Sequence, residues 1–196
     1  MTIAESAKSI EEHLRQLRRE FHRHPEISGN EKKTAARIVR ELSEIGGFEI
    51  REGVGGHGVI AELSGALPGP VIALRADMDA LQIEEETGLS FCSENCGVMH
   101  ACGHDNHITM VLGAARLLAQ RKDELKGKVR LIFQPSEELS PQGGSRKMIE
   151  AGALKGVDAV FGIHVWPDLP LGKVGIKAGP LMAASDHFTV TIKGKP

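Results

Sequence analysis

The sequence lacks an excess of charge of either sign, and it lacks a long hydrophobic run. Its 196 residues include 24 lysines and arginines against 26 aspartates and glutamates, which gives a formal net charge of -2. We therefore expect neither nucleic acid nor a membrane surface as a partner, because both are usually bound through a basic patch. No apolar stretch is long enough to cross a bilayer, and the polar segment 1–8 is unlike a signal peptide.

Cysteine is also scarce, and its three copies are Cys92, Cys96 and Cys102. An odd number so close together argues against the disulfide framework of a secreted protein and fits reduced thiols or metal ligands. Together with the lack of an apolar leader, this predicts a cytoplasmic protein. Internal repeats and low-complexity tracts are absent as well, and the length allows one ordinary domain, or one domain and a piece of another.

Hydrophobic periodicity predicts strands that alternate with helices. Apolar residues recur at helical spacing in the segments Ile10–Phe21, Ala35–Ile45, His107–Arg121 and Arg146–Ala151. Short apolar or alternating runs predict strands at Phe48–Arg51, Val59–Leu63, Val71–Leu74, Val129–Phe133, Val157–Ile163, Gly172–Lys177 and His187–Lys193. This alternation indicates an α/β fold with a mostly parallel sheet and helices on both of its faces.

Polar side chains follow the ends of several predicted strands. Open α/β sheets bind ligands beyond the carboxyl ends of their strands, so we expect these side chains to meet at one edge of the sheet. The residues concerned are Asp77 and Asp79 after Leu74, Glu137 and Glu138 after Phe133, His164 after Ile163, and the Cys102/His104 turn before a helix. The histidines expected to be structural, or to support a ligand, are His22, His24, His100 and His107.

The segment 99–107 places a thiol and an imidazole close together in a turn that contains glycine. Cys102 and His104 can bind one ion together, because thiolate and neutral imidazole both suit zinc or a neighbouring first-row metal. Other roles stay open. They are a buried thiol beside a helix-capping turn, a nucleophilic Cys102 in a thiol hydrolase, and a structural zinc site with Cys92 and Cys96, whose spacing matches no common zinc motif.

The adjacent carboxylates Glu137 and Glu138 can divide two tasks. One can ligate a metal while the other acts as general base for a metal-activated water, as hydrolysis of an unactivated amide requires. Asp79 can hold a ligand in position. The alternatives are a solvated acidic loop for the two glutamates, a core histidine for His164, and turn or N-cap chemistry for Asp77 and Asp79.

Several ordered segments of the chain resemble those of the M20 metallopeptidase family, in its amidohydrolase branch. They are Arg75–Leu81, Met99–His107, Phe133–Glu138 and Gly162–Val165, and the similarity extends from the segment 22–26 to the end of the chain. This branch includes hippurate hydrolases, N-acyl-amino-acid aminoacylases and auxin-conjugate hydrolases. The resemblance implies a catalytic domain like that of the zinc exopeptidases.

Carried over residue by residue, the resemblance implies a site for two divalent metal ions, with zinc, manganese, cobalt and nickel all open. The implied ligands are Cys102, which bridges the ions, His104, Glu138 and His164. Glu137 is the implied general base and Asp79 the supporting aspartate. Such an enzyme cleaves the amide bond of N-acyl amino acids or related small conjugates. The alternatives are a metallo-carboxypeptidase or dipeptidase, and a metal-binding fragment with partial or no activity.

The resemblance also implies a longer parent protein. Family members carry a lid and dimerisation domain inserted in the catalytic domain, followed by a C-terminal segment that supplies a last histidine ligand. We therefore expect residues 1–182 to be the N-terminal part of the catalytic domain. Residues 183–196 are expected to be the truncated start of the lid domain, including its first strand. The parent is expected to be a homo-oligomer that acts on a small molecule.

Overall fold

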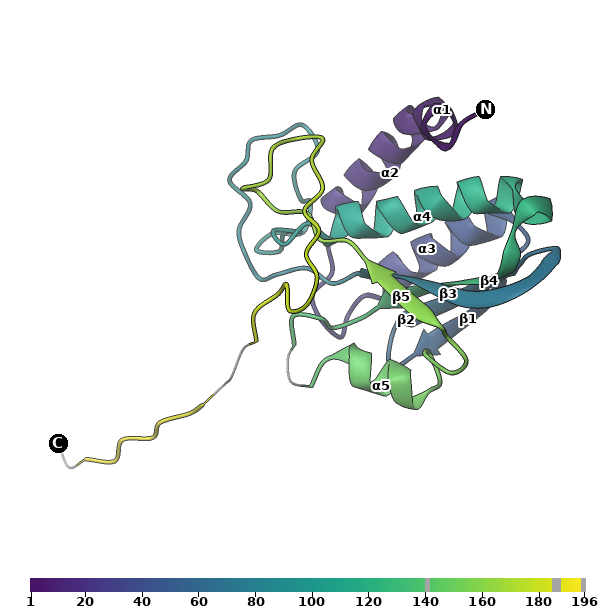
Figure 1. Ribbon diagram of the computed structural model, residues 1–196. Helices are drawn as coiled ribbons and strands as arrows, with labels where there is room; N and C mark the ends of the chain where they lie inside the picture. The colour runs from purple at the N-terminus through teal and green to yellow at the C-terminus, as the bar shows by residue number, and fades with distance from the viewer. Residues whose placement is uncertain (140–141, 185–187, 195–196) are drawn as a thin grey trace. The chain divides into compact units, whose positions relative to one another are not determined.

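The computed structural model describes residues 1–139, 142–184 and 188–194 (Figure 1). The helices are α1 (Ile3–Ser9), α2 (Glu11–Arg23), α3 (Lys32–Ile45), α4 (His104–Gln120), a short 3-10 helix η1 (Lys122–Glu124) and α5 (Gly144–Glu150). The strands are β1 (Glu49–Val54), β2 (Gly58–Ser64), β3 (Leu67–Asp77), β4 (Lys126–Gln134) and β5 (Ala159–Gly162). Contacts within the chain divide it into two units, Met1–Val165 and Trp166–Pro196, and all of these elements belong to the first.

The strands form one mixed sheet in the order β1-β2-β4-β3-β5. β3 runs parallel to β4 and β5, whereas β2 runs antiparallel to β1 and β4. The predicted α/β class is confirmed, and the parallel half of the sheet is the half that carries the polar residues singled out above. β1 and β2 are antiparallel because residues 55–57 alone connect them, and a parallel connection needs a crossover of about a dozen residues or more.

Helices cover both faces of the sheet, as predicted. α2, α3 and α4 lie on one face and α5 lies on the other (Figure 1). The face under α2, α3 and α4 holds the larger buried cluster, with Leu17, Ile38 and Phe133, and the face under α5 holds a smaller one, with Ile132 and Met148. Neighbouring residues of β4 thus pack on opposite faces, which explains its nearly continuous apolar sequence. Among the described residues no helix is long and apolar enough to span a membrane.

β3 is longer than the sequence predicts, because it continues to Asp77 instead of ending at Leu74. Its last residues alternate a buried alanine with charged side chains, which ends the apolar run but not the strand. Arg75 and Asp77 form an ion pair, with Nη1 and Oδ2 2.7 Å apart, so both charges are accommodated while the backbone still pairs with β4. Asp77 is therefore part of the strand and not of the turn after it.

α4 begins at His104, one turn earlier than predicted. Gly103 precedes it in the left-handed conformation, with φ 82°, and glycine adopts this conformation without steric cost. The first turn of the helix carries the buried polar side chains His104, Asp105 and His107, and the apolar repeat starts only at Ile108. Hydrophobic periodicity detects the apolar part of a helix, so it missed this turn.

The predicted strands at 172–177 and 188–193 are not formed. Residues 166–184 and 188–194 adopt turns, bends and irregular backbone. Their alternating apolar side chains are exposed, for example Val174 at 79% and Ile192 at 90%. A strand needs a neighbour for its backbone N–H and C=O groups, and no described strand pairs with either segment. His187 lies outside the described residues, and the domain boundary after residue 182 stays a prediction.

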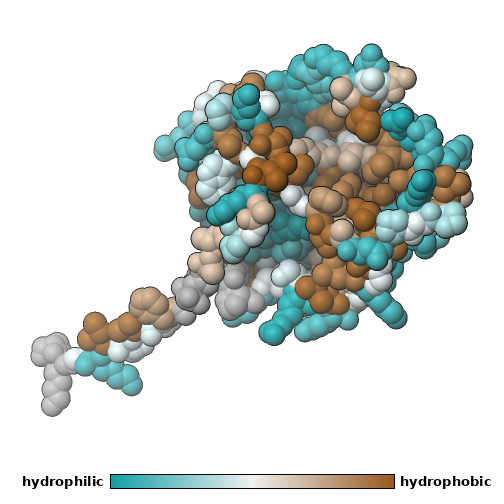
Figure 2. Space-filling view, in the orientation of Figure 1, coloured by the Kyte–Doolittle hydropathy of each residue, from teal (hydrophilic) through white to brown (hydrophobic). Residues whose placement is uncertain are grey.

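The edge strand β5 carries exposed apolar side chains. Val160 is 49% exposed and Phe161 is 59% exposed, and β5 pairs only with β3 among the described strands. Figure 2 shows hydrophobic residues gathered on the face where β5 lies in Figure 1. An unpaired apolar edge of this kind presents both backbone hydrogen-bonding groups and apolar surface to another segment or molecule.

Candidate functional site

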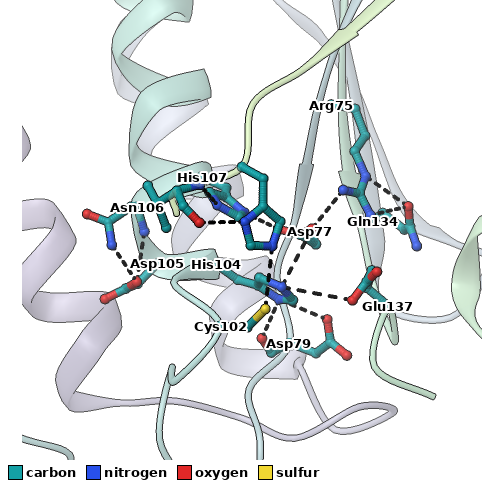
Figure 3. Close-up of polar contacts among 12 residues, drawn as sticks. Arg75, Asp77, Asp79, Cys102, His104, Asp105, Asn106, His107, Gln134 and Glu137 are labelled. Atoms are coloured by element: carbon teal, nitrogen blue, oxygen red, sulfur yellow. Dashed lines mark hydrogen bonds and ion pairs between the residues drawn. The ribbon is translucent and has the colours of Figure 1, made fainter. Parts of the chain in front are cut away.

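The carboxyl ends of β3, β4 and β5 bring predicted site residues to one edge of the sheet. Asp77 is the last residue of β3. Glu137 and Glu138 follow β4, and His164 follows β5. Because these strands are parallel, their carboxyl ends meet. The N-terminus of α4 adds His104 at the same place, as Figure 3 shows.

His104 lies at the centre of this cluster and is fully buried. Its Nδ1 donates a hydrogen bond to the main-chain carbonyl of Asp79 at 2.8 Å, which fixes the orientation of the ring. Its Nε2 is 3.6 Å from Glu138 Oε1, 3.6 Å from Asp77 Oδ2 and 3.9 Å from Glu137 Oε2. Figure 3 shows the ring of His104 between Asp77 and Glu137. Histidines that bind metals are commonly oriented by a backbone carbonyl in this way, with the second nitrogen left for the ion.

Cys102 and His164 add a second group of donors beside His104. Cys102 Sγ is 3.5 Å from Nε2 of His164, and Nδ1 of His164 donates to the main-chain carbonyl of the next residue at 2.6 Å. One donor atom from each of Cys102, His104 and His164 lies within 4.8 Å of the others. His104 forms an equally compact group with Glu137 and Glu138. The structure therefore brings the predicted metal ligands together, with His104 common to both groups.

Two atoms that face each other in the site are buried and have no hydrogen-bond partner among the described residues. They are His104 Nε2 and Glu138 Oε1, which are 3.6 Å apart. Unpaired buried polar atoms are rare, because each costs about 1–3 kcal/mol of stability. A divalent cation would satisfy both atoms, and zinc and its neighbours accept thiolate, imidazole and carboxylate ligands. The residues present therefore fit the predicted metal ions.

The site concentrates negative charge. Burial would lower the pKa of His104, but its contacts with Asp79 and Cys102 outweigh this effect and raise the pKa to about 11. At Glu137 the pKa of the carboxyl is also raised, first by burial and then by the negative charges of Glu138 and Asp77. The surroundings of His104 thus favour a cation, and the raised pKa makes Glu137 a stronger base than an ordinary glutamate.

Asp79 lies between His104 and the glutamate pair. Its Oδ2 accepts hydrogen bonds from Ser28 Oγ at 2.6 Å and from the main-chain N–H of Glu138 at 3.0 Å. Burial would raise the pKa of Asp79, but the nearby ring of His104, 3.4 Å from Oδ1, and the hydrogen bond from Ser28 outweigh it and lower the pKa. The ionised carboxylate therefore holds the loop after β4, while the Asp79 carbonyl holds the ring of His104. This is the position that the predicted supporting role requires.

Asp77 is engaged by a cation and a histidine of the protein itself. Arg75 Nη1 lies 2.7 Å from Oδ2 and His107 Nδ1 donates to Oδ1 at 2.6 Å. Burial would raise the pKa of Asp77, but the hydrogen bond from His107 and the charge of Arg75 hold it well below its usual range. Asp77, His104 and His107 also form a compact group of potential ligands. The guanidinium already neutralises this carboxylate, so the group is a poor cation site.

Arg75 and His107 extend the framework of the site. Arg75 also donates through Nε and Nη2 to Gln134 Oε1, at 2.9 and 2.7 Å, which ties the end of β3 to the end of β4. His107 Nε2 accepts a hydrogen bond from the main-chain N–H of Val165 at 3.0 Å, directly after His164. His107 was predicted to be structural or to support a ligand, whereas Arg75 and Gln134 were not singled out by sequence pattern. The sequence signal for Arg75 was a charged residue that follows an apolar run within one strand.

The histidines outside the cluster differ in their partners. His22 Nδ1 is 2.7 Å from Asp105 Oδ2, and its Nε2 is 3.1 Å from Glu85 Oε1, so this ring joins α2, α4 and the segment after β3. His100 is also buried, but neither of its ring nitrogens has a hydrogen-bond partner among the described residues. Burial lowers the pKa of His100 to about 4, so this ring is neutral at physiological pH.

A structural zinc site with Cys92 and Cys96 finds no support in the geometry. Both are free and exposed thiols, whereas Cys102 is partly buried. In the part of the chain that the structure describes, neither Cys92 nor Cys96 belongs to a compact group of potential metal ligands. The cysteine that lies among other donors is therefore Cys102.

Comparison with known proteins agrees with this geometry. Residues 73–196 match the model of peptidase family M20/M25/M40. The chain belongs to this family. It is 51% identical over 190 residues to an N-acetylcysteine deacetylase of Bacillus subtilis, and the match covers 96% of this chain and 49% of that protein. It is 46% identical over 194 residues to thermostable carboxypeptidase 1 of Saccharolobus solfataricus, with coverages of 98% and 49%.

A solved structure of an M20 protein also resembles the fold. The YXEP protein of Bacillus subtilis, described as a dinuclear metal-binding peptidase from the M20 family, matches with a TM-score of 0.83 and 51% sequence identity. The match covers 89% of this chain and 48% of that structure. The M20 chain described here thus spans about half the length of the relatives it matches.

Proposed function

We propose that this M20-family protein is a metal-dependent hydrolase that cleaves the amide bond of N-acyl amino acids or related small conjugates. The observation that carries the proposal is that the buried atoms His104 Nε2 and Glu138 Oε1 lie 3.6 Å apart and have no hydrogen-bond partner among the described residues. The thiol of Cys102 and the ring of His164 lie beside them. Membership in the M20 family and the likeness to a dinuclear metal-binding relative support a pair of ions. Zinc, manganese, cobalt and nickel all accept these donors.

The proposal gives each residue of the cluster a role. Cys102, His104, Glu138 and His164 are the residues that would hold the ions, with the thiolate of Cys102 available to both. Bound divalent ions would polarise the scissile carbonyl and lower the pKa of a water molecule. Glu137, whose pKa is raised by burial, would serve as the general base and would return the proton to the leaving nitrogen. Asp79 keeps His104 and Glu138 in place.

The names of the relatives point to one kind of scissile bond. A deacetylase of N-acetylcysteine and a carboxypeptidase both cleave an amide whose nitrogen belongs to an amino acid with a free carboxylate. The two activities differ in the group on the carbonyl side of that amide. It is a small acyl group for the deacetylase and a peptide for the carboxypeptidase. We favour N-acyl amino acids, and we keep a metallo-carboxypeptidase or dipeptidase as the second candidate.

The test combines metal analysis with hydrolysis assays. The purified protein is loaded with zinc, manganese, cobalt or nickel, and its metal content and its turnover of hippurate, N-acetyl amino acids and blocked dipeptides are measured with and without a chelator. We expect bound metal and chelator-sensitive release of the amino acid from the N-acyl substrates. Preferential cleavage of the blocked dipeptides would favour the carboxypeptidase, and bound metal without any turnover would favour a metal-binding fragment.

The variant Glu137→Gln separates metal binding from catalysis. Its carboxamide keeps the size of the side chain but cannot accept the proton, so the metal content should stay unchanged and turnover should fall at least about 100-fold. Glu124→Gln is the matched control, because Glu124 is a glutamate of the distant helix η1. Turnover retained by Glu137→Gln would contradict the role of general base.

The contact between Cys102 and His164 keeps a thiol hydrolase as a further candidate. Their Sγ and Nε2 atoms are 3.5 Å apart, which is the pairing that a nucleophilic cysteine and its base require. A thiol hydrolase would survive chelators and lose activity on alkylation. The metal hydrolase is favoured because the thiol mechanism gives no role to Glu138 Oε1, a buried atom without a hydrogen-bond partner in the part of the chain that the structure describes.

Two further predictions accompany the proposed function. The thiols of Cys92, Cys96 and Cys102 are free, which fits the reducing conditions of the cytoplasm, where we place the protein. We also expect the parent protein to be a homo-oligomer. Cell fractionation and light scattering on the purified protein test the two statements separately.

A further inference from the structure

Glu31 lies outside the motifs that line the site, yet its side chain is hydrogen-bonded to the loop that carries Glu137 and Glu138. It is fully buried and immediately precedes α3. Its Oε1 accepts hydrogen bonds from the main-chain N–H of Ser136 at 2.7 Å and from Ser136 Oγ at 3.1 Å. Two hydrogen bonds from one residue to a buried carboxylate are strong and directional, so they fix the position of Ser136 relative to Glu31.

Ser136 has a backbone conformation that residues with a side chain rarely adopt. Its φ of 54° makes it the one non-glycine residue with positive φ in the part of the chain that the structure describes. Such a left-handed conformation is sterically unfavourable and persists only where the surroundings enforce it. Because Ser136 directly precedes Glu137 and Glu138, its conformation sets the direction in which both side chains leave β4.

The far side of the same turn is packed closely against the start of α5. The main-chain N–H of Gly144 donates to the carbonyl of Ser136 at 3.3 Å. A Cβ added at Gly143 would lie only 2.6 Å from that carbonyl oxygen, so a side chain there would displace the turn. Ser136 is thus held by Glu31 on one side and by Gly143 and Gly144, at the start of α5, on the other.

A second buried carboxylate holds the loop just beyond Glu137. Asp79 Oδ2 accepts from the main-chain N–H of Glu138 at 3.0 Å and from Ser28 Oγ at 2.6 Å. Ser28 and Glu31 both belong to the connection between α2 and α3. This connection therefore reaches the backbone on both sides of Glu137, directly at Ser136 and through Asp79 at Glu138.

We propose that Glu31 is a positioning residue, which holds Ser136 in its left-handed conformation and thereby directs the carboxylates of Glu137 and Glu138 toward His104. The part of this inference that concerns metal affinity rests on the proposed function, whereas the part that concerns the backbone of the loop does not. A purely structural role for Glu31 would lower the stability of the whole chain without a specific effect on the loop.

Glu41 provides the matched control for that distinction. Like Glu31 it is a buried glutamate, at 1% exposure, and it lies within α3, the helix that Glu31 immediately precedes. Its partners are Arg37, His13 and Arg116, none of which contacts the proposed ligands. Glu41→Leu should therefore destabilise the chain without changing the loop after β4.

The first experiment measures amide hydrogen exchange in the metal-free chain. Relative to amides of β4, exchange at Ser136 and Glu138 should accelerate about tenfold or more in Glu31→Leu, because a lost hydrogen bond opens the loop locally. Glu31→Gln retains an acceptor oxygen and should give a smaller change, and Glu41→Leu should give none. If Glu31→Leu leaves the exchange of Glu138 at its wild-type rate, or if Glu41→Leu changes it equally, the inference is wrong.

The second experiment measures Co²⁺ affinity by spectroscopic titration. Glu31→Leu should weaken binding about 10-fold, as is typical when a group that supports a ligand is removed. Adding Ser136→Gly should restore part of the lost affinity, because glycine adopts the left-handed conformation without steric cost, whereas adding Ser136→Ala should restore none. Equal results for glycine and alanine would contradict the inference. If the unmodified chain binds no Co²⁺, the proposed function fails, and the exchange measurement alone decides the role of Glu31.

Discussion

His107 Nδ1 donates a hydrogen bond to Asp77 Oδ1 at 2.6 Å, and both side chains are buried. The other ring nitrogen, Nε2, accepts a hydrogen bond from the main-chain N–H of Val165 at 3.0 Å. A ring that donates through Nδ1 and accepts through Nε2 is neutral. One imidazole of α4 thus connects the end of β3 to the residue after His164, and so fixes the backbone of a proposed ligand.

Replacing His107 with leucine should weaken both folding and metal binding. The change leaves the carboxylate of Asp77 and the N–H of Val165 without this partner, so the free energy of unfolding should fall by about 2–3 kcal/mol. Metal affinity should fall about 10-fold, because the segment of His164 is no longer fixed. Urea unfolding and metal titration measure the two effects.

The control for this prediction is Thr109→Val on the same helix. Thr109 is buried and donates only to the main-chain carbonyl of Asp105, so its loss should cost about 1 kcal/mol and leave metal affinity unchanged. A His107→Leu variant that binds metal as tightly as the unmodified chain would show that the contact with Val165 does not position His164.

Metal affinity should depend on pH through His104. The pKa of this residue is raised to about 11, so the metal-free ring is protonated at neutral pH, and an ion binds Nε2 only after this nitrogen has lost its proton. Each proton released on binding raises the affinity about 10-fold per pH unit, so the loss of the His104 proton alone predicts a rise of at least about 10-fold per pH unit from about pH 6 to about pH 8. Calorimetry in buffers with different ionisation enthalpies counts the released protons. Affinity that does not change with pH would contradict the prediction.

The residues of the site could be predicted from the sequence where they follow a strand. Glu137, Glu138 and His164 each come just after an apolar run, and the carboxyl ends of parallel strands meet at one edge. The structure places the two glutamates 3.9 and 3.6 Å from His104 Nε2. Hydrophobic pattern and topology therefore place these residues at one edge of the sheet, whereas their predicted roles as ligands and base rest on the family resemblance.

Features that depend on contacts between distant segments could not be predicted. Glu31 precedes Lys32 and Lys33 in the sequence and has the pattern of a solvated helix start, yet it is fully buried against Ser136. The alternation of apolar residues at 172–177 predicts a strand, but a strand also needs a neighbour, and that requirement is not visible in the segment itself. For Glu31 and for the segment 172–177 alike, the sequence does not show which other segment makes the contact.

Glu41 should make the stability of the chain depend on pH. Its buried carboxylate pairs with Arg116, His13 and Arg37 at 2.6, 2.7 and 3.1 Å. Burial would raise the pKa of Glu41, but these partners outweigh it and lower the pKa from 4.5. Because the folded pKa is depressed, the stabilisation is present above the unfolded pKa and is lost as pH falls through the folded pKa.

Glu41→Gln tests this pH dependence directly. At about pH 7 the variant should be less stable than the unmodified chain by about 2 kcal/mol, because it loses charge-assisted hydrogen bonds. The difference should begin to shrink below about pH 4.5, the ordinary pKa at which the carboxyl group of the unfolded chain takes up a proton, and it should vanish once pH has fallen through the lower folded-state pKa. Urea unfolding at neutral and acidic pH measures both values, and a gap of the same size at both pH values would show that the charge of Glu41 is not its cause.

The three cysteines should differ in their response to cobalt. Cys102 is partly buried and its Sγ is 3.5 Å from His164 Nε2, whereas Cys92 and Cys96 are exposed. A cobalt ion bound by a thiolate shows an intense charge-transfer absorption that oxygen and nitrogen ligands do not produce. Cys102→Ser should therefore abolish this absorption and weaken cobalt binding at least about 100-fold, because serine is a poor ligand for these metals.

The exposed cysteines supply controls that share the chemistry but not the location. Cys92→Ser and Cys96→Ser each remove one thiol and should leave both the absorption and the affinity unchanged, because neither residue lies in a compact group of potential ligands. If the absorption instead depends on Cys92 or Cys96, cobalt binds in the connection after β3 and not at the sheet edge. Persistence of the absorption in Cys102→Ser would likewise remove Cys102 from the proposed ligand set, and the metal would then be held by His104, Glu138 and His164 without a bridging thiolate.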